Sequence, residues 1–131
     1  IKAALSLASR INRASEEKYM ISTPKDVFNL VKYPFQSEKN EKFGVVLLDV
    51  RGKVICWEII SIGILTKTLV HPREVFHLAI RHQAAGMILV HNHPSGDLTP
   101  SLEDIHVTET LLSASRMMGI PIRDHLIISD E

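Results

Sequence analysis

The residues with the clearest capacity for chemistry lie in the stretch HNHPSGDLTPSLED, which covers residues 91–104. Two of them, His91 and His93, end the apolar run MILVHNH, which is typical of a central strand covered on both faces. Because side chains alternate along a strand, the two imidazoles are expected to project to the same side. The turn residues after His93, and the helix start that Pro100 permits, are expected to bring Asp104 back toward both histidines.

Two histidines and one aspartate form a nitrogen and oxygen donor set that suits zinc. Three protein ligands leave a fourth tetrahedral position for water, as catalytic zinc sites require, whereas a structural site is closed by four protein ligands. Zinc lowers the pKa of a bound water molecule toward ~7, which provides a nucleophile at neutral pH. The pattern therefore predicts a hydrolytic zinc site formed by His91, His93 and Asp104.

Each part of this pattern also has a purely structural interpretation. Ser101 and Asp104 have the S-x-x-D spacing of a helix cap with an acidic residue in the first turn, where the helix dipole favours it. An isolated H-x-H pair is more often not a pair of metal ligands. The combination favours a metal site, because two histidines on one face, a rigid turn and a capped helix start occur together. The letters HNH do not indicate an HNH nuclease, whose motif residues are spread over a longer segment.

The elements expected to position these residues alternate between helices and strands. Helical periodicity, helix-start signals and β-rich runs predict the order helix, helix, strand, strand, helix, strand, helix, strand. The expected helices lie within residues 1–15, 22–33, 71–83 and 99–119. The expected strands lie in a hairpin over residues 42–63, with a turn at DVRGK, and within residues 87–93 and 120–129. The chain is therefore expected to be an α/β protein.

Composition limits the classes of function. The 131 residues correspond to about one domain. Lys plus Arg and Asp plus Glu number 15 each, so bulk charge does not favour binding to DNA or to an anionic membrane. A single cysteine, Cys56, lies in an apolar stretch and is interpreted as a small buried hydrophobic residue. With no signal peptide and no long apolar run in the sequence, we expect a cytoplasmic protein with no membrane partner.

The chain resembles a known metalloprotease motif, the JAMM (MPN+) motif, at five positions: His91, His93, Pro94, Ser101 and Asp104. The stretches HPREV, HNHPSG and DHLIIS resemble the bacterial RadC family, whose C-terminal part is a JAB/MPN-type domain, over about residues 20–129. Ile64 departs from the family pattern, which has Thr after the glycine. In that family a helix-hairpin-helix region usually precedes this domain, and the 131 residues are expected to include only its tail. Residues 1–19 are therefore interpreted as the tail of an upstream region, and residues 20–131 as the JAB/MPN-type RadC domain.

This resemblance implies a fold, a metal and a chemistry. The fold is a three-layer α/β arrangement of the cytidine-deaminase-like kind, with a mixed β-sheet flanked by helices. By this resemblance, Zn²⁺ is expected to be held by His91, His93 and Asp104. Ser101 is expected to help stabilise the tetrahedral oxyanion, and an upstream glutamate is expected to act on the zinc-bound water. The sequence disfavours a nucleoside deaminase, because the P-C-x-x-C zinc ligands of that class are missing.

Four upstream glutamates are candidates for the general base: Glu38, Glu41, Glu58 and Glu74. Glu41 is preferred because it immediately precedes the apolar strand FGVVLLD, where the JAMM glutamate also lies. Glu74 is adequately explained by the dipole of the helix that it begins. Asp124 and His125 are candidates to hydrogen-bond the zinc-bound histidines, although a structural role serves equally well.

Two hypotheses of different class follow. The first is a zinc-dependent hydrolase acting on a peptide or isopeptide-like amide, with Glu41 as base and Ser101 as oxyanion partner. The alternative is a non-enzymatic module of DNA repair or recombination with a structural or vestigial metal site. An intact ligand set with a plausible base favours the hydrolase. The substrate and the oligomeric state stay open, and weak or no direct DNA binding is expected of this chain.

Overall fold

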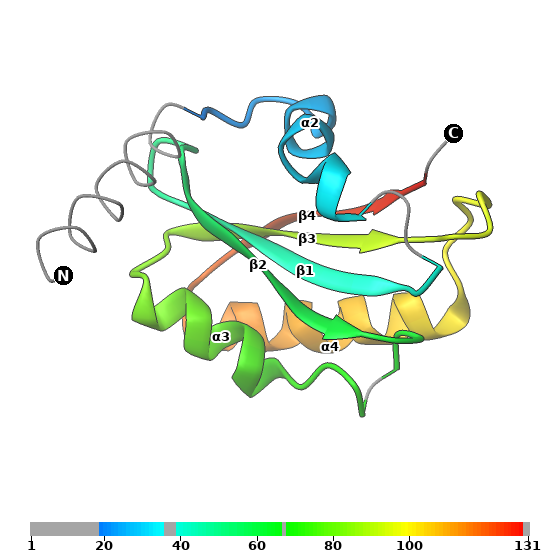
Figure 1. Cartoon of the computed structure of the whole chain (residues 1–131). Coiled ribbons are helices and arrows are strands. Elements are labelled where there is room, and N and C mark those ends of the chain that lie inside the picture. The colour runs from blue at the N-terminus through cyan, green and yellow to red at the C-terminus, as the bar shows by residue number, and fades with distance from the viewer. Residues whose placement is uncertain (1–18, 36–38, 67, 130–131) are drawn as a thin grey trace, which may run out of the picture.

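A computed structural model describes residues 19–35, 39–66 and 68–129 (Figure 1). The helix expected within residues 1–15 lies outside the described residues. The described elements are α2 (Pro24–Phe35), β1 (Lys42–Leu48), β2 (Val54–Ile62), α3 (Pro72–Arg81), β3 (Gly86–Asn92), α4 (Leu102–Met118) and β4 (Ile122–Ile128). Their order is the order predicted from residue 22 onward. None of the described helices is long and apolar enough to cross a membrane.

The four strands form one mixed sheet in the order β2-β1-β3-β4. β1 is antiparallel to both β2 and β3, whereas β3 and β4 are parallel and are connected through α4. β3 reads GMILVHN, and all seven of its residues are buried. This confirms the prediction of a central strand covered on both faces.

Helices cover both faces of the sheet, which gives three layers (Figure 1). α2 packs on one face through Val27, Val31 and Phe35, against a cluster that includes Val46 and Val90. The opposite face of the sheet is formed by the alternate residues of the same strands. It packs against α3 and α4 in a second cluster. Since neighbouring residues of a strand face opposite sides, the continuous apolar runs of β1 and β3 supply both clusters. The predicted three-layer α/β fold is confirmed.

Local sequence signals explain where the helices begin and end. α4 starts with a capping box, in which Ser101 and Asp104 each accept the backbone N–H of the other, and it stops at Gly119, which adopts a φ of 67°. α3 starts at Pro72 after His71, whose side chain accepts the N–H of Arg73. The expected continuation of α3 to residue 83 was wrong by two residues, because the backbone turns left-handed at residue 83, with a φ of 53°.

The topology gathers three chain segments at one edge of the sheet. Lys42 begins β1 and Asn92 ends β3, and the antiparallel register of these strands places their two ends side by side. The turn that follows β3 then delivers the first residue of α4, Leu102, to the same edge. Residues about 50 positions apart in the sequence are thereby neighbours, and the candidate site lies among them.

Candidate metal centre

The two histidines of the H-x-H pair lie together, as strand alternation predicts. His91 is 1% exposed and His93 is 8% exposed. Their rings meet edge to face, with the ring centroids 4.8 Å apart. The alternating geometry at the end of β3 therefore brings both imidazoles to one buried point.

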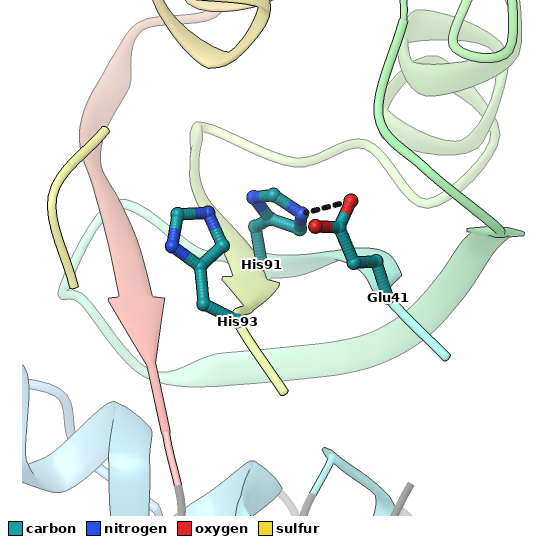
Figure 2. A group of neighbouring side chains, drawn as sticks. All are labelled: Glu41, His91 and His93. Carbon is teal, nitrogen blue, oxygen red and sulfur yellow. Dashed lines mark ion pairs between the residues drawn. The ribbon is translucent and has the colours of Figure 1, made fainter. Parts of the chain in front are cut away.

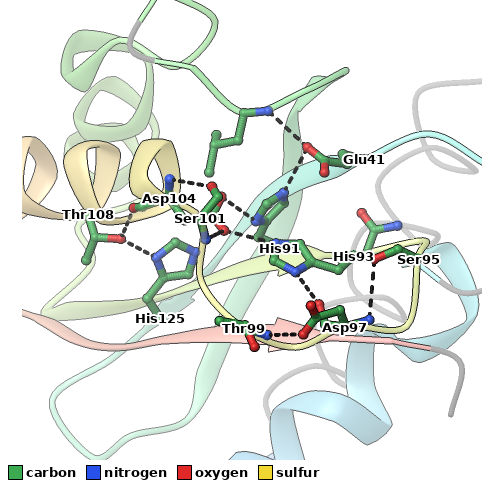
Figure 3. A network of polar contacts seen from close by, with 12 residues as sticks. Glu41, His91, His93, Ser95, Asp97, Thr99, Ser101, Asp104, Thr108 and His125 are labelled. Atoms are coloured by element: carbon green, nitrogen blue, oxygen red, sulfur yellow. Dashed lines mark hydrogen bonds and ion pairs between the residues drawn. The ribbon is translucent and has the colours of Figure 1, made fainter.

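Asp104 reaches this point from the first turn of α4 (Figure 3). Its Oδ2 lies 2.9 Å from Nε2 of His93, and its Oδ1 lies 3.4 Å from Nδ1 of His91. The same carboxylate accepts the backbone N–H of Ser101 at 2.8 Å. The helix cap and the contact with the histidines are thus functions of one side chain, so the two interpretations of S-x-x-D do not exclude each other.

Glu41 points toward Nε2 of His91 (Figure 2), the ring nitrogen that does not face Asp104. Its Oε2 lies 3.5 Å from Nε2 of His91 and accepts the backbone N–H of Leu65 at 3.1 Å. Glu41, His91 and His93 each offer one ligand atom, and these atoms all lie within 4.8 Å of one another, so this group could hold a metal ion. Glu41 was expected here as a base, and its suitability as a ligand was not foreseen.

The buried imidazole of His91 shows that the residues fit a metal ion. Both of its ring nitrogens are buried and make no hydrogen bond within the described part of the chain. Burial lowers the pKa of His91, which favours the neutral form that binds metals. Ligands bound tetrahedrally at 2.0–2.2 Å are about 3.3–3.6 Å from one another. His91 Nδ1 lies 3.4 Å from Asp104 Oδ1, and His91 Nε2 lies 3.5 Å from Glu41 Oε2, so each pair matches that spacing. Because the two pairs use different nitrogens of the ring, a single ion bound to His91 can use only one of them.

The orientation of the His93 imidazole also fits a metal ion at this site. Nδ1 of His93 lies 2.7 Å from the carbonyl oxygen of Asp97, which can only accept a hydrogen bond, so Nδ1 carries a proton. In the neutral ring, Nε2 then presents a lone pair to the Asp104 carboxylate 2.9 Å away. Two acceptors this close require a proton or a metal ion between them. A histidine that binds metal through one nitrogen commonly donates from the other to a backbone carbonyl, as His93 does here.

Asp104 is suited to remain charged at this site. Burial by itself would raise the pKa of Asp104, but the hydrogen bond from the Ser101 N–H and the neighbouring histidines together hold it below its usual value. The side chain is 4% exposed, whereas that of Glu41 is 27% exposed. The two carboxylates therefore differ in their access to solvent, with Asp104 enclosed and Glu41 open.

The two other glutamates that the structure describes among the candidates for the base lie elsewhere. Glu58 and Glu74 line a separate cavity of about 570 Å³ between β2 and α3. Glu38 lies outside the described residues. Of the three candidates that the structure describes, Glu41 is the one that lies against His91.

Asp124 and His125 were candidates to hydrogen-bond the histidines, with a structural role left equally open, and their described hydrogen bonds go to other residues. Nδ1 of His125 lies 2.6 Å from the hydroxyl oxygen of Thr108 (Figure 3). This hydroxyl donates a hydrogen bond to the backbone carbonyl of Asp104. Burial lowers the pKa of His125 to about 4. The carboxylate of Asp124 accepts the backbone N–H of His125. Neither residue has a described hydrogen bond to His91 or His93, and Asp97 supplies the supporting carbonyl instead, which no residue-type signal could reveal.

The sequence of the chain is similar to that of a known protein family. Residues 21–131 match the family of RadC-like JAB domains. The chain is 50% identical over 129 residues to a UPF0758 protein of Protochlamydia amoebophila, which covers 98% of this chain and 56% of the relative. It is 47% identical over 131 residues to UPF0758 proteins of Caldanaerobacter subterraneus and Methanosarcina mazei, covering 99% of this chain and 56% and 57% of those relatives. It thus spans a little over half the length of these curated relatives. The chain belongs to the RadC family through its RadC-like JAB domain.

Proposed function

We propose that this domain is a zinc-dependent hydrolase that cleaves a peptide or isopeptide-like amide bond. The observation that carries the proposal is the imidazole of His91, whose two buried nitrogens lack hydrogen bonds among the described residues and face a carboxylate on either side. A buried ring in this state is costly unless a cation uses its lone pair.

The difference in exposure assigns a role to each carboxylate. Asp104, enclosed and charged, would hold the metal with His91 and His93. Glu41 is accessible from outside and would take the proton of the attacking water through its carboxylate. When bound, zinc would lower the pKa of a water molecule to ~7 and would polarise the carbonyl group of the substrate.

Ser101 would assist at the developing oxyanion. Its hydroxyl oxygen accepts the N–H of Asp104 at 3.0 Å, so the hydroxyl proton stays available for donation. A cavity of about 240 Å³ lies beside Asp104 and is lined partly by Pro100, Ile105 and Ile127. An apolar group of the substrate next to the cleaved bond would be accommodated there.

The test is a matched pair of glutamate variants assayed on a library of internally quenched peptides and lysine-linked isopeptides. Glu41→Gln should retain zinc and melting temperature but lose turnover by about 10²–10⁴-fold, because glutamine cannot accept the proton. Glu74→Gln is the control and should be as active as the unmodified chain. Ser101→Ala should lose about 10²–10³-fold, the usual effect of one oxyanion donor.

Two results would contradict the proposal. An active, zinc-loaded Glu41→Gln protein would refute the assignment of the base. A zinc-loaded, folded protein that cleaves no member of the library, with or without the variants, would argue against amide hydrolysis and favour a structural metal.

A further inference from the structure

The residue between the two histidines has a role of its own. Asn92 is the last residue of β3 and is 3% exposed. Since side chains alternate along the strand, it faces the α2 side of the sheet while His91 and His93 face the opposite side. A buried asparagine is costly unless its amide is fully hydrogen-bonded, so its contacts explain its presence.

The described hydrogen bonds of its side chain go to backbone groups at the end of α2, at the start of β1 and at Asn40 between them. Oδ1 accepts the N–H of Lys42, and Nδ2 donates to the carbonyl oxygens of Phe35 at 3.4 Å and Asn40 at 3.2 Å. The side chain therefore uses both its acceptor and its donor capacity. It anchors the segment that runs from the end of α2 to the start of β1, at Phe35 and at the two residues that flank Glu41.

These contacts continue the sheet one residue beyond its backbone ladder. The last paired residues of β1 and β3 are Phe43 and His91, and the Asn92 side chain then takes the next N–H, that of Lys42. From the other side, the Gly63 N–H donates to the Glu41 carbonyl oxygen at 2.7 Å. The backbone of Glu41 is thereby held from both neighbouring strands.

We propose that Asn92 is a positioning residue that sets the Glu41 carboxylate against His91. Because His91 and Asn92 are consecutive, one strand carries a metal ligand on one face and the anchor of the base on the other. The distance between ligand and base then depends in part on this one strand, together with the contacts of Glu41 to Gly63 and Leu65. This inference rests on the proposed function only for what Glu41 does there, and the placement itself can be tested separately.

The required chemistry is specific to an amide. Asn92→Asp keeps the size but directs a carboxylate oxygen at two backbone carbonyls, so those contacts become repulsive. Asn92→Ser keeps a smaller group that can donate and accept once. Asn40→Ala is a matched control in the same segment, because Asn40 contributes only its backbone carbonyl to the contact.

Amide hydrogen exchange measured by NMR on the zinc-loaded proteins tests the placement. The reporter is the Leu65 N–H, which bonds to the Glu41 carboxylate and makes no described hydrogen bond with Asn92. In Asn92→Asp its exchange should accelerate by about tenfold or more, with an intermediate effect in Asn92→Ser and none in Asn40→Ala. The backbone amides of Val107 and Leu111 lie in α4, on the face of the sheet opposite to α2, and should keep their protection from exchange. The zinc content should not change.

Turnover gives the second measurement. On a substrate found with the peptide library, Asn92→Asp should lower kcat by about tenfold or more with KM little changed, because the base is displaced while the substrate site is intact. Unaltered exchange at Leu65 in folded Asn92→Asp and Asn92→Ser would overturn the inference. So would equal acceleration at Leu65, Val107 and Leu111, since that would show general destabilisation. If the unmodified protein cleaves nothing, the exchange result still decides the role of Asn92, and only the proposed function fails.

Discussion

Replacement of Asp104 by asparagine tests which carboxylate completes the metal site. Asparagine keeps the size of the side chain and can still accept the Ser101 N–H, so the cap of α4 should survive. It loses the charge that faces the Nε2 of His93 and the Nδ1 of His91. The metal-free protein should therefore remain folded while its zinc affinity falls.

The size of the effect follows from binding linkage. Zinc at 100 times its Kd stabilises a folded protein by about 2.7 kcal/mol. For a domain of this length, that corresponds to a rise in melting temperature of roughly 10 °C. Loss of partners that merely orient ligands weakens metal binding by about 10–100-fold, so loss of a ligand should cost at least ~100-fold. At the same zinc concentration, Asp104→Asn should then gain only about 0.4 kcal/mol, or roughly 2 °C.

Differential scanning fluorimetry with and without zinc measures both shifts, and elemental analysis confirms the metal content. Asp97→Asn is the matched control, because Asp97 contacts His93 only through its backbone carbonyl, and it should keep the full shift. Glu41→Gln should also keep it. If Asp104→Asn retains the full shift and Glu41→Gln loses it, the ligands are Glu41, His91 and His93, and the assignment of Glu41 as the base is wrong.

Two further predictions concern pH and DNA. The pKa of His125 is about 4 in the folded protein and ~6.5 when unfolded, so between these values the unfolded state binds more protons and stability falls as pH decreases. In urea unfolding with a chelator, the metal-free protein should lose about 2 kcal/mol more between pH 7 and 4.5 than His125→Gln, and equal losses would contradict this. With 15 basic and 15 acidic residues, the chain should bind duplex DNA only weakly at 150 mM salt. Sub-micromolar binding by fluorescence anisotropy would instead support the module of DNA repair or recombination.

Much of the candidate site was predictable because its signals are local. The same-side placement of His91 and His93 follows from the alternation of a strand, and the position of Asp104 follows from helix capping after a short turn. The buried strand at residues 86–92 and the order of the elements follow from apolar periodicity in the same way. Each of these signals depends on residues within one or two elements.

The contacts of Glu41 and Asn92 depend on more distant parts of the chain. Lys42 and Asn92 are 50 residues apart and meet only because β1 pairs with β3 in one particular register. The Leu65 N–H reaches Glu41 because β2 occupies the other side of β1. Neither the strand order nor the register can be read from periodicity, which repeats identically along each strand.

By itself, then, the sequence determined the donor set, the direction of the two imidazoles and the capped helix that carries Asp104. The tertiary structure decided which of the described glutamates faces His91, which carbonyl orients His93 and what the asparagine between the histidines holds. The physical reason is that residue type and local spacing set the chemistry and direction of a side chain. The distances between residues of different segments are set only when the strands pair and one backbone lies beside another.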